Sequence, residues 1–294
     1  MKKLLPIAAL GMAMLVPQAH ANVIIDGVNL QPGGQFWVST VFENQLTSVN
    51  DTLYGVGYVN VINGPSGPSW QNGDNSTQLA YYFSGYNVGA WYGFGGWNGA
   101  ASYTGWHSLA SDGANWGLNF AAGATDINFI NGGTQFYADA AGTLNPYTQT
   151  TQAAAIAAAT SGKLWANYTA QAFDYIQGSL GLQTGGTLYG SNGASSANNG
   201  GTGIGYLNIT GGDAYSNLNT NGFTNLTNGG VAIAGGVDAQ IYSTYTNTNP
   251  VNQWPLTGSI NLKTTAVPEP ASLALFGLGL FGLGAAARKG KKSA

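Results

Sequence analysis

Hydrophobic and polar positions alternate in short runs along most of the chain, a pattern typical of strands with one buried and one exposed face. Residues 206–210 and 258–263 alternate strictly. The runs are rich in Val, Ile, Thr, Tyr, Phe and Trp, which favour strands. Strands are predicted at residues 35–42, 53–62, 78–83, 126–130, 134–138, 163–169, 205–210, 240–245 and 259–264.

Turn signals separate these runs. Asn-Gly pairs occur at eight positions and Asp-Gly pairs at two, and such pairs accept the positive φ angles of tight hairpin turns. Asn131-Gly132-Gly133 stands between two predicted strands, so it predicts a hairpin. Frequent reversals with few helices predict an all-β fold, an antiparallel β-sandwich or jelly-roll-like body.

One short helix is predicted within this body. Residues 151–159 are Ala-rich, which favours a helix. Thr150 or Thr151 is the expected N-cap, and Gly162 is the expected stop.

The N-terminus has the three parts of a secretory signal peptide. Lys2 and Lys3 precede an apolar run at residues 4–16, and Ala19 and Ala21 form a small-x-small cleavage site. We expect residues 1–21 to form a signal helix that signal peptidase removes before Asn22. The alternative, a retained anchor, has only thirteen largely apolar residues, fewer than a membrane span requires.

The C-terminus has a second apolar stretch. Residues 271–287 contain no charge and are followed by a basic cluster that begins with Arg288 and Lys289. A helix over them is about 26 Å long, near the lower limit for a transmembrane helix, and the basic tail is expected on the cytoplasmic side. The sequence therefore predicts three segments: a signal peptide at 1–21, an exported β-rich domain at 22–266 and a C-terminal signal at 267–294.

This C-terminal segment resembles the PEP-CTERM sorting signal of Gram-negative bacteria. The resemblance rests on Val267-Pro268-Glu269-Pro270, on the Gly/Leu/Phe-rich stretch and on Arg288-Lys289. It implies that an exosortase recognises the motif after transient insertion into the inner membrane, cleaves nearby and sends the protein to the cell surface or the exterior. The alternative is a plain tail anchor with an accidental Pro-Glu-Pro sequence.

A second resemblance concerns the body. Residues 55–64, 78–83 and 162–165 are similar to flocculation-associated PEP-CTERM proteins. These surface proteins are implicated in holding cells in exopolysaccharide flocs. The resemblance implies a structural or adhesive role in an exopolysaccharide matrix, biofilm or floc, with matrix polysaccharide as partner.

Composition and charge exclude several kinds of function. The chain has no Cys, so it has no disulfide, Cys-ligated metal or Cys nucleophile. Residues 22–266 contain two lysines and ten acidic residues, a formal charge of −8. Such a body lacks the basic surface that nucleic acid requires.

Candidate catalytic groups are few. After signal cleavage His107 is the only His that remains, and one His cannot form a multi-His metal site. Most carboxylates stand beside Gly, Asn or Ser, which is typical of turns. We therefore expect no enzyme activity, no catalytic residue, no metal and no cofactor, with a glycan hydrolase that uses two Asp as the minor alternative.

A Gly-rich region contains four tryptophans, Trp91, Trp97, Trp106 and Trp116. Their rings could stack on sugars or pack in a core, and core packing is the commoner use of large aromatic residues. The leading hypothesis is an exported matrix protein. The alternative is a lectin-like module that binds glycan through these tryptophans.

Overall fold

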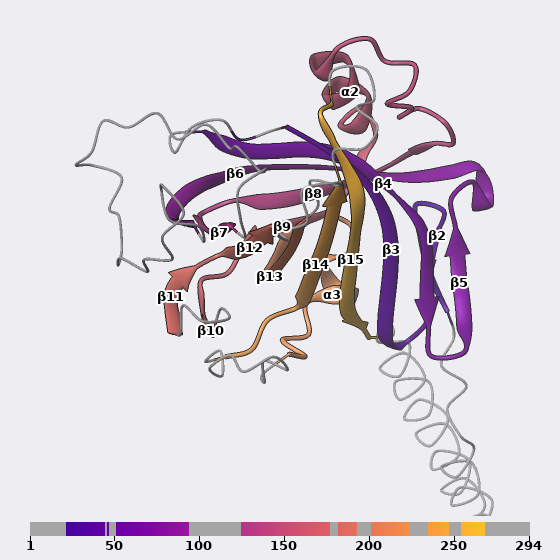
Figure 1. Ribbon diagram of the computed structural model, residues 1–294. Coiled ribbons are helices and arrows are strands. Elements are labelled where there is room, and N and C mark those ends of the chain that lie inside the picture. The colour runs from indigo at the N-terminus through magenta and orange to yellow at the C-terminus, as the bar shows by residue number, and fades with distance from the viewer. Residues whose placement is uncertain are drawn as a thin grey trace, which may run out of the picture.

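The computed structural model describes residues 22–44, 46, 51–93, 125–176, 182–192, 201–223, 235–246 and 254–267. Figure 1 shows their arrangement. The strands are β1 (Val23–Ile25), β2 (Val28–Leu30), β3 (Gly33–Glu43), β4 (Thr52–Gly64), β5 (Gly67–Gln71), β6 (Thr77–Gly93), β7 (Thr125–Ile130), β8 (Gly133–Ala140), β9 (Lys163–Ala170), β10 (Phe173–Ile176), β11 (Leu182–Gly186), β12 (Leu188–Asn192), β13 (Gly201–Gly211), β14 (Ala239–Thr246) and β15 (Leu256–Ala266). The helical elements are η1 (Asp74–Ser76), α2 (Gln152–Ala159) and α3 (Tyr215–Leu218).

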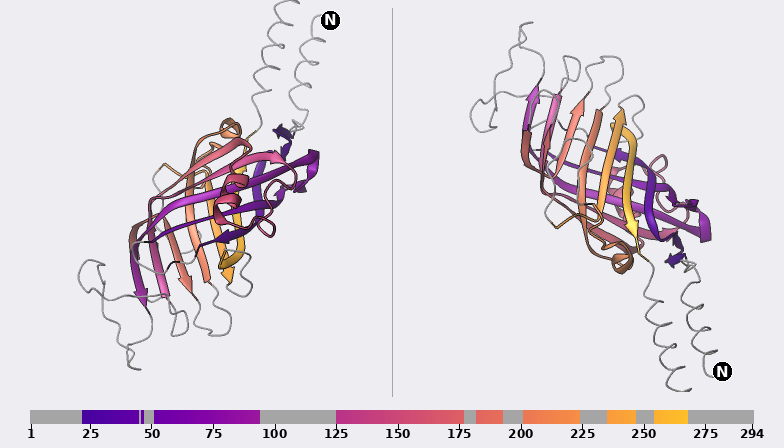
Figure 2. Two further views of the ribbon diagram at one scale, coloured as in Figure 1. Left: turned by 90° about the horizontal axis from the view of Figure 1, so that it is seen from above. Right: turned by 90° about the horizontal axis from the view of Figure 1, so that it is seen from below.

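Most strands belong to one antiparallel sheet that closes on itself like a barrel. Its neighbours run in the order β3, β4, β6, β8, β9, β13, β14 and β15, and β15 pairs with β3 to complete the ring. Figure 2 shows β15, in yellow, beside β3, in indigo, although they come from opposite ends of the sequence. We call this ring the closed sheet.

The all-β, antiparallel prediction is confirmed, but the sandwich or jelly-roll prediction is wrong. A sandwich leaves strand edges on two separate sheets, whereas here β15 pairs with β3 and eight strands form a ring, with β5 paired to β4 alone beside it. Alternation of apolar and polar residues is the same in both architectures, because each has one apolar face. The sequence pattern could not distinguish them.

The hairpin predicted at Asn131-Gly132-Gly133 is also wrong. β7 and β8 both pair antiparallel with β6, in one continuous register on either side of the interruption. They are two halves of one long strand. Asn131 and Gly132 have positive φ angles of 62° and 96°, as in a tight turn. A Cβ on Gly132 would lie 2.5 Å from the Tyr86 ring, so the break lets this ring pack against bare backbone.

β9 and β12 likewise occupy one position in the ring. β9 lies between β8 and β13, and β12 lies between β7 and β13. Between them the chain leaves the closed sheet and forms the β10–β11 hairpin. Phe173 of this hairpin packs against Tyr189 and Tyr206, with ring centroids 4.9 and 4.6 Å away.

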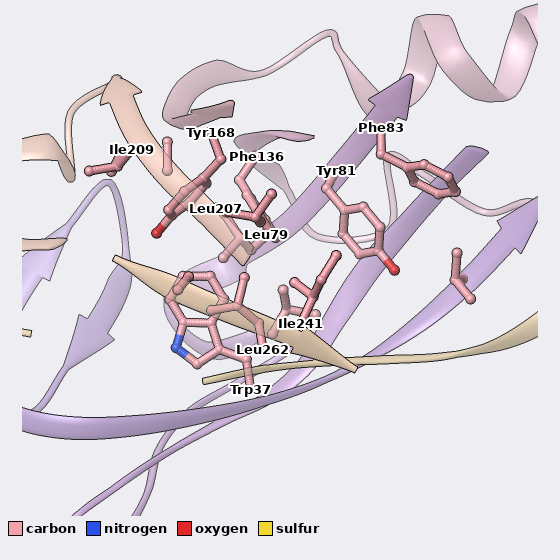
Figure 3. Close-up of a cluster of buried hydrophobic side chains, with 14 of the residues drawn as sticks. Trp37, Leu79, Tyr81, Phe83, Phe136, Tyr168, Leu207, Ile209, Ile241 and Leu262 are labelled. Carbon is pink, nitrogen blue, oxygen red and sulfur yellow. The ribbon is translucent and has the colours of Figure 1, made fainter. Parts of the chain in front are cut away.

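The interior of the closed sheet is filled with aromatic and aliphatic side chains, as Figure 3 shows. Trp37 from β3 meets Phe136 from β8 edge-on, with centroids 5.5 Å apart. Gly57 in β4 stands opposite Tyr81 of β6, and a Cβ there would lie 2.3 Å from the Tyr81 ring. Glycine at this strand position therefore makes room for a large ring.

Helix α2 covers part of the outer face. The predicted N-cap at Thr151 is confirmed, because its hydroxyl accepts the Ala154 N–H at 3.0 Å. The helix ends at Ala159, the last residue of the predicted stretch, and its C-cap is Thr160 rather than a glycine. Ala155 and Ala159 are buried against a cluster that includes Phe42, and Figure 2 shows α2 outside the ring.

Candidate functional site

The last described residue of the chain is fixed by two hydrogen bonds at one end of the closed sheet. The Val267 N–H donates to the Asn217 carbonyl at 2.8 Å, and the Asn217 side-chain amide donates to the Val267 carbonyl at 3.1 Å. Asn217 is 1% exposed and Ala266 is 3% exposed, whereas Val267 is 38% exposed. We call Asn217, Ala266 and Val267 the exit site.

Hydrogen bonds before and after helix α3 hold Asn217 in place. It lies in the one-turn helix α3, whose Leu218 is buried. The Ala214 N–H before the helix donates to the Trp165 carbonyl at 2.8 Å. After the helix, the buried Asp238 carboxylate accepts the N–H groups of Thr220 and Asn221 at 2.6 and 2.7 Å. The amide that binds Val267 is therefore part of a well-bonded segment.

The N-terminal end of the described chain lies at the same end of the closed sheet. β1 and β2 form a hairpin, the plug hairpin, whose Val28 and Leu30 are fully buried in the same cluster as Trp37. Three residues after Leu30, Gly33 begins β3 opposite Ala266. The Trp165 indole N–H donates to the Ile25 carbonyl at 3.0 Å. The chain thus enters and leaves at one end, the exit end.

Ion pairs tie the plug hairpin down. The Lys163 ammonium lies 3.0 Å from the Asp26 carboxylate and 2.7 Å from that of Asp213. These charge-assisted hydrogen bonds raise the pKa of Lys163 above its usual value, and the bond with Asp213 has the larger effect. The hydrogen bond from Lys163 is also the main reason that the pKa of Asp213 is lowered.

The residues that follow this exit site carry a known signal. The profile of the PEP-CTERM protein-sorting motif matches residues 266–289. The chain therefore carries a PEP-CTERM sorting motif. The PEP-CTERM motif supports export and processing by an exosortase, consistent with a cell-surface or extracellular protein. Its first two matched residues, Ala266 and Val267, belong to the exit site.

Two other comparisons give no match. No curated protein and no solved structure matches this chain.

The structure describes only some of the predicted site residues. Val267 lies in the exit site, and Asn22 is exposed at the start of the plug hairpin. The backbone of Trp91 lies in β6, but its side chain is outside the described part. The remaining predicted site residues also lie outside it: Ala19, Ala21, Trp97, Trp106, Trp116, Pro268, Glu269, Pro270, Arg288 and Lys289.

The predicted signal and transmembrane helices fall outside the described residues as well. Among the residues that are described, no helix is both long and apolar enough to cross a membrane. The apolar stretch at 271–287 is not among them.

Several carboxylates accept backbone hydrogen bonds. Asp74 lies between Gly73 and Asn75, and its place in the short helix η1 at a turn agrees with the neighbouring residue types, whereas Asp139 and Asp174 lie in β8 and β10 without a Gly, Asn or Ser neighbour. Asp74 accepts the Gln71 N–H at 2.8 Å and Asp174 accepts the Gly185 N–H at 3.3 Å. Asp139 accepts the N–H of the next residue, Ala140, at 2.7 Å. Within the described ranges, no three His, Cys, Asp or Glu side chains are grouped so that they could hold a metal ion.

Glu43 is a polar group that the sequence analysis missed. It is 6% exposed and lines a cavity of about 40 Å³ inside the closed sheet, together with Trp37, Ser39 and Tyr81. Burial raises the pKa of Glu43 to about 8. A ligand of ordinary drug size needs about 300 Å³ or more, so the cavity has room for a few water molecules only.

A sequence signal for Glu43 does exist. Trp37, Ser39, Val41 and Glu43 are alternate residues of β3, and all four are buried. A strand predicted to end at residue 42 stops one position before this glutamate. Extension of the period-2 pattern by one residue would have placed its carboxyl group in the interior.

Proposed function

We propose that this protein has a structural or adhesive role in an exopolysaccharide matrix, biofilm or floc, as flocculation-associated PEP-CTERM proteins do, in a Gram-negative host and without catalysis. The observation that supports the proposal is a partly exposed strip on the outer face of β3, β14 and β15, which lie side by side in Figure 1. The outer strip consists of Phe36, Thr40, Tyr242, Thr244, Ser259, Asn261 and Lys263. Phe36, Thr244 and Lys263 are exposed and the other members are half-buried.

The outer strip presents hydroxyl groups in a row. Ser259 stands opposite Thr244 on one side and Thr40 on the other, and the Thr244 and Ser259 hydroxyls lie 3.0 Å apart. Neighbouring strands are about 4.8 Å apart, so the row is regular. Hydroxyl groups both donate and accept hydrogen bonds, as the hydroxyls of a polysaccharide do.

One end of the outer strip adds a ring and a cation. The Lys263 ammonium lies 5.3 Å from the centroid of the Tyr242 ring. Lys163 is occupied by two aspartates, whereas no carboxylate of the described residues forms an ion pair with Lys263. The ring can pack against the apolar face of a sugar, and the ammonium can bind a sugar carboxylate.

Retention of the processed protein on polymer purified from the producing cells tests the proposal. Tyr242→Ala and Lys263→Gln each remove one contact of the outer strip. We expect about tenfold weaker retention for each, which corresponds to a loss of about 1.4 kcal/mol. Tyr147→Ala is the matched control, because Tyr147 is 61% exposed and its ring packs on Phe42 near α2.

The same assay separates the alternatives. Unchanged retention of both strip variants would contradict the proposed surface. Retention that falls instead in Trp97→Ala and Trp106→Ala would favour the lectin-like alternative that uses the Trp91–Trp116 region. Release of reducing sugar from the polymer would favour the hydrolase alternative.

A further inference from the structure

We propose that the fold itself sets the N-terminal limit of exosortase cleavage, and that Asn217 is the positioning residue that enforces it. This inference rests on exosortase processing, which the sorting motif implies. The limit lies between Val267 and Pro268. The chain released after processing therefore ends at Pro268 or at a later residue.

Peptide bonds within β15 are closed to a peptidase. β15 pairs with β14 on one side as far as Thr264, and with β3 on the other side as far as Ala266. A peptidase that binds its substrate as an extended strand needs backbone groups that are free to pair. Access to β15 would require the ring to open and the apolar interior to be exposed to water.

The bond between Val267 and Pro268 is protected by a different contact. Its carbonyl is the group that accepts the Asn217 side-chain amide at 3.1 Å, and the Val267 N–H is bound to the Asn217 carbonyl. Both backbone groups of Val267 are thus engaged. Pro268 has no N–H, so its nitrogen cannot donate to a neighbouring strand. The bond between Pro268 and Glu269 is the first one beyond the exit site.

The expected membrane segment limits the cleavable bonds on the C-terminal side. The uncharged stretch begins at residue 271, four residues after Val267. Four extended residues span at most about 14 Å. With this stretch in the bilayer, the exit end lies close to the membrane surface, and the enzyme has only this short segment available for cleavage.

Cleavage breaks a single peptide bond. The carbonyl carbon forms a new bond to the oxygen of water or to another nucleophile, and its bond to the amide nitrogen breaks. The proton lost by the nucleophile is taken up by the amine, which leaves with the C-terminal piece. The intact mass of the released protein identifies the bond. The experiment compares producing cells that have an exosortase with cells of the same strain that lack it.

Wild-type protein should end at Pro268 or later. Asn217→Ala removes the side-chain donor and frees the Val267 carbonyl, so we expect an additional product that ends at Val267. Asn219→Ala is the matched control: Asn219 is exposed, lies in the same segment and bonds to Tyr215 instead. It should give the wild-type mass. Thermal unfolding shows whether each variant is folded.

A second variant leaves the exit site intact. A Gly-Ser-Gly-Ser insertion between Val267 and Pro268 adds unprotected residues before the motif, and we expect products that end within the insertion. A wild-type product that ends at Val267 or earlier would overturn the inference. The inference would also be overturned if the cleaved bond kept the same distance from Pro268 in both variants, Asn217→Ala and the insertion, while both were folded. Absence of cleavage in every variant would instead contradict exosortase processing.

Discussion

Glu43 is an ionisable side chain held in the apolar interior of the closed sheet. Burial is the cause of its raised pKa of about 8, compared with an ordinary value of 4.5. The folded protein therefore binds a proton at neutral pH that the unfolded chain releases. Folding and protonation of this residue are linked.

This linkage predicts that stability falls as pH rises. Between pH 4.5 and 8 the folded state holds more protons, so the free energy of unfolding should decrease across this window, by at most about 5 kcal/mol. Glu43→Gln should abolish most of the decrease, because the amide does not titrate. Urea unfolding at a series of pH values measures both slopes.

The control for this measurement is Asp74→Asn, which changes an exposed carboxyl group. It should keep the wild-type slope. Equal stability of the wild type at pH 5 and pH 8.5 would contradict the assignment of a neutral, buried Glu43.

Among the elements, the plug hairpin closes the exit end. Leu30 is fully buried in the main cluster, whereas Ile24 of the same hairpin is 64% exposed. Leu30→Ala should lower the free energy of unfolding by about 2–5 kcal/mol, as for other buried Leu-to-Ala changes. Ile24→Ala should change it by about 0.5 kcal/mol or less. Thermal or urea unfolding of the two variants provides the comparison.

Similar costs for the two variants would show that the hairpin is not anchored in the interior. Loss of stability in Leu30→Ala alone would confirm that the plug hairpin is part of the core. The hairpin therefore belongs to the structural unit, although its strands contain only three residues each.

The elements also show what the sequence could predict. Long alternating runs such as β3, β4 and β15 were predicted within a few residues, because their apolar face repeats every second position. The short strands β1, β2 and β5 were missed, since three to five residues contain too little periodicity. At Asn131-Gly132 the local turn preference was satisfied without a reversal, because β6 pairs with both flanking strands.

The exit site also has one part that the sequence could predict and one part that it could not. The sorting motif could be recognised from the order of residues 267–289 alone. Asn217 could not, because it lies 50 positions from Val267 and its role depends on ring closure. Such a distant contact leaves no trace in a local pattern.

On the scale of the whole molecule, ring closure by β15 predicts how truncation acts. A chain of residues 22–267 keeps every pair of the ring, so we expect one cooperative thermal transition. A chain that stops at residue 258 loses most of β15 and leaves one edge of β3 and one edge of β14 without a partner, although β3 still pairs with β4 and β14 with β13. It should show no cooperative transition in calorimetry or near-ultraviolet circular dichroism. A cooperative transition in the shorter chain would contradict the closed architecture.

The position of β15 between two partners also determines how the molecule would respond to a mechanical load. Tension applied at Val267, while the tail is still attached, acts along β15, which has eleven register pairs with β3 and eight with β14. These ladders are then loaded in shear, so many hydrogen bonds share the force at once instead of opening one after another. A force that pulls on the residues after Val267 should therefore extend residues 268–270 before it unfolds the closed sheet.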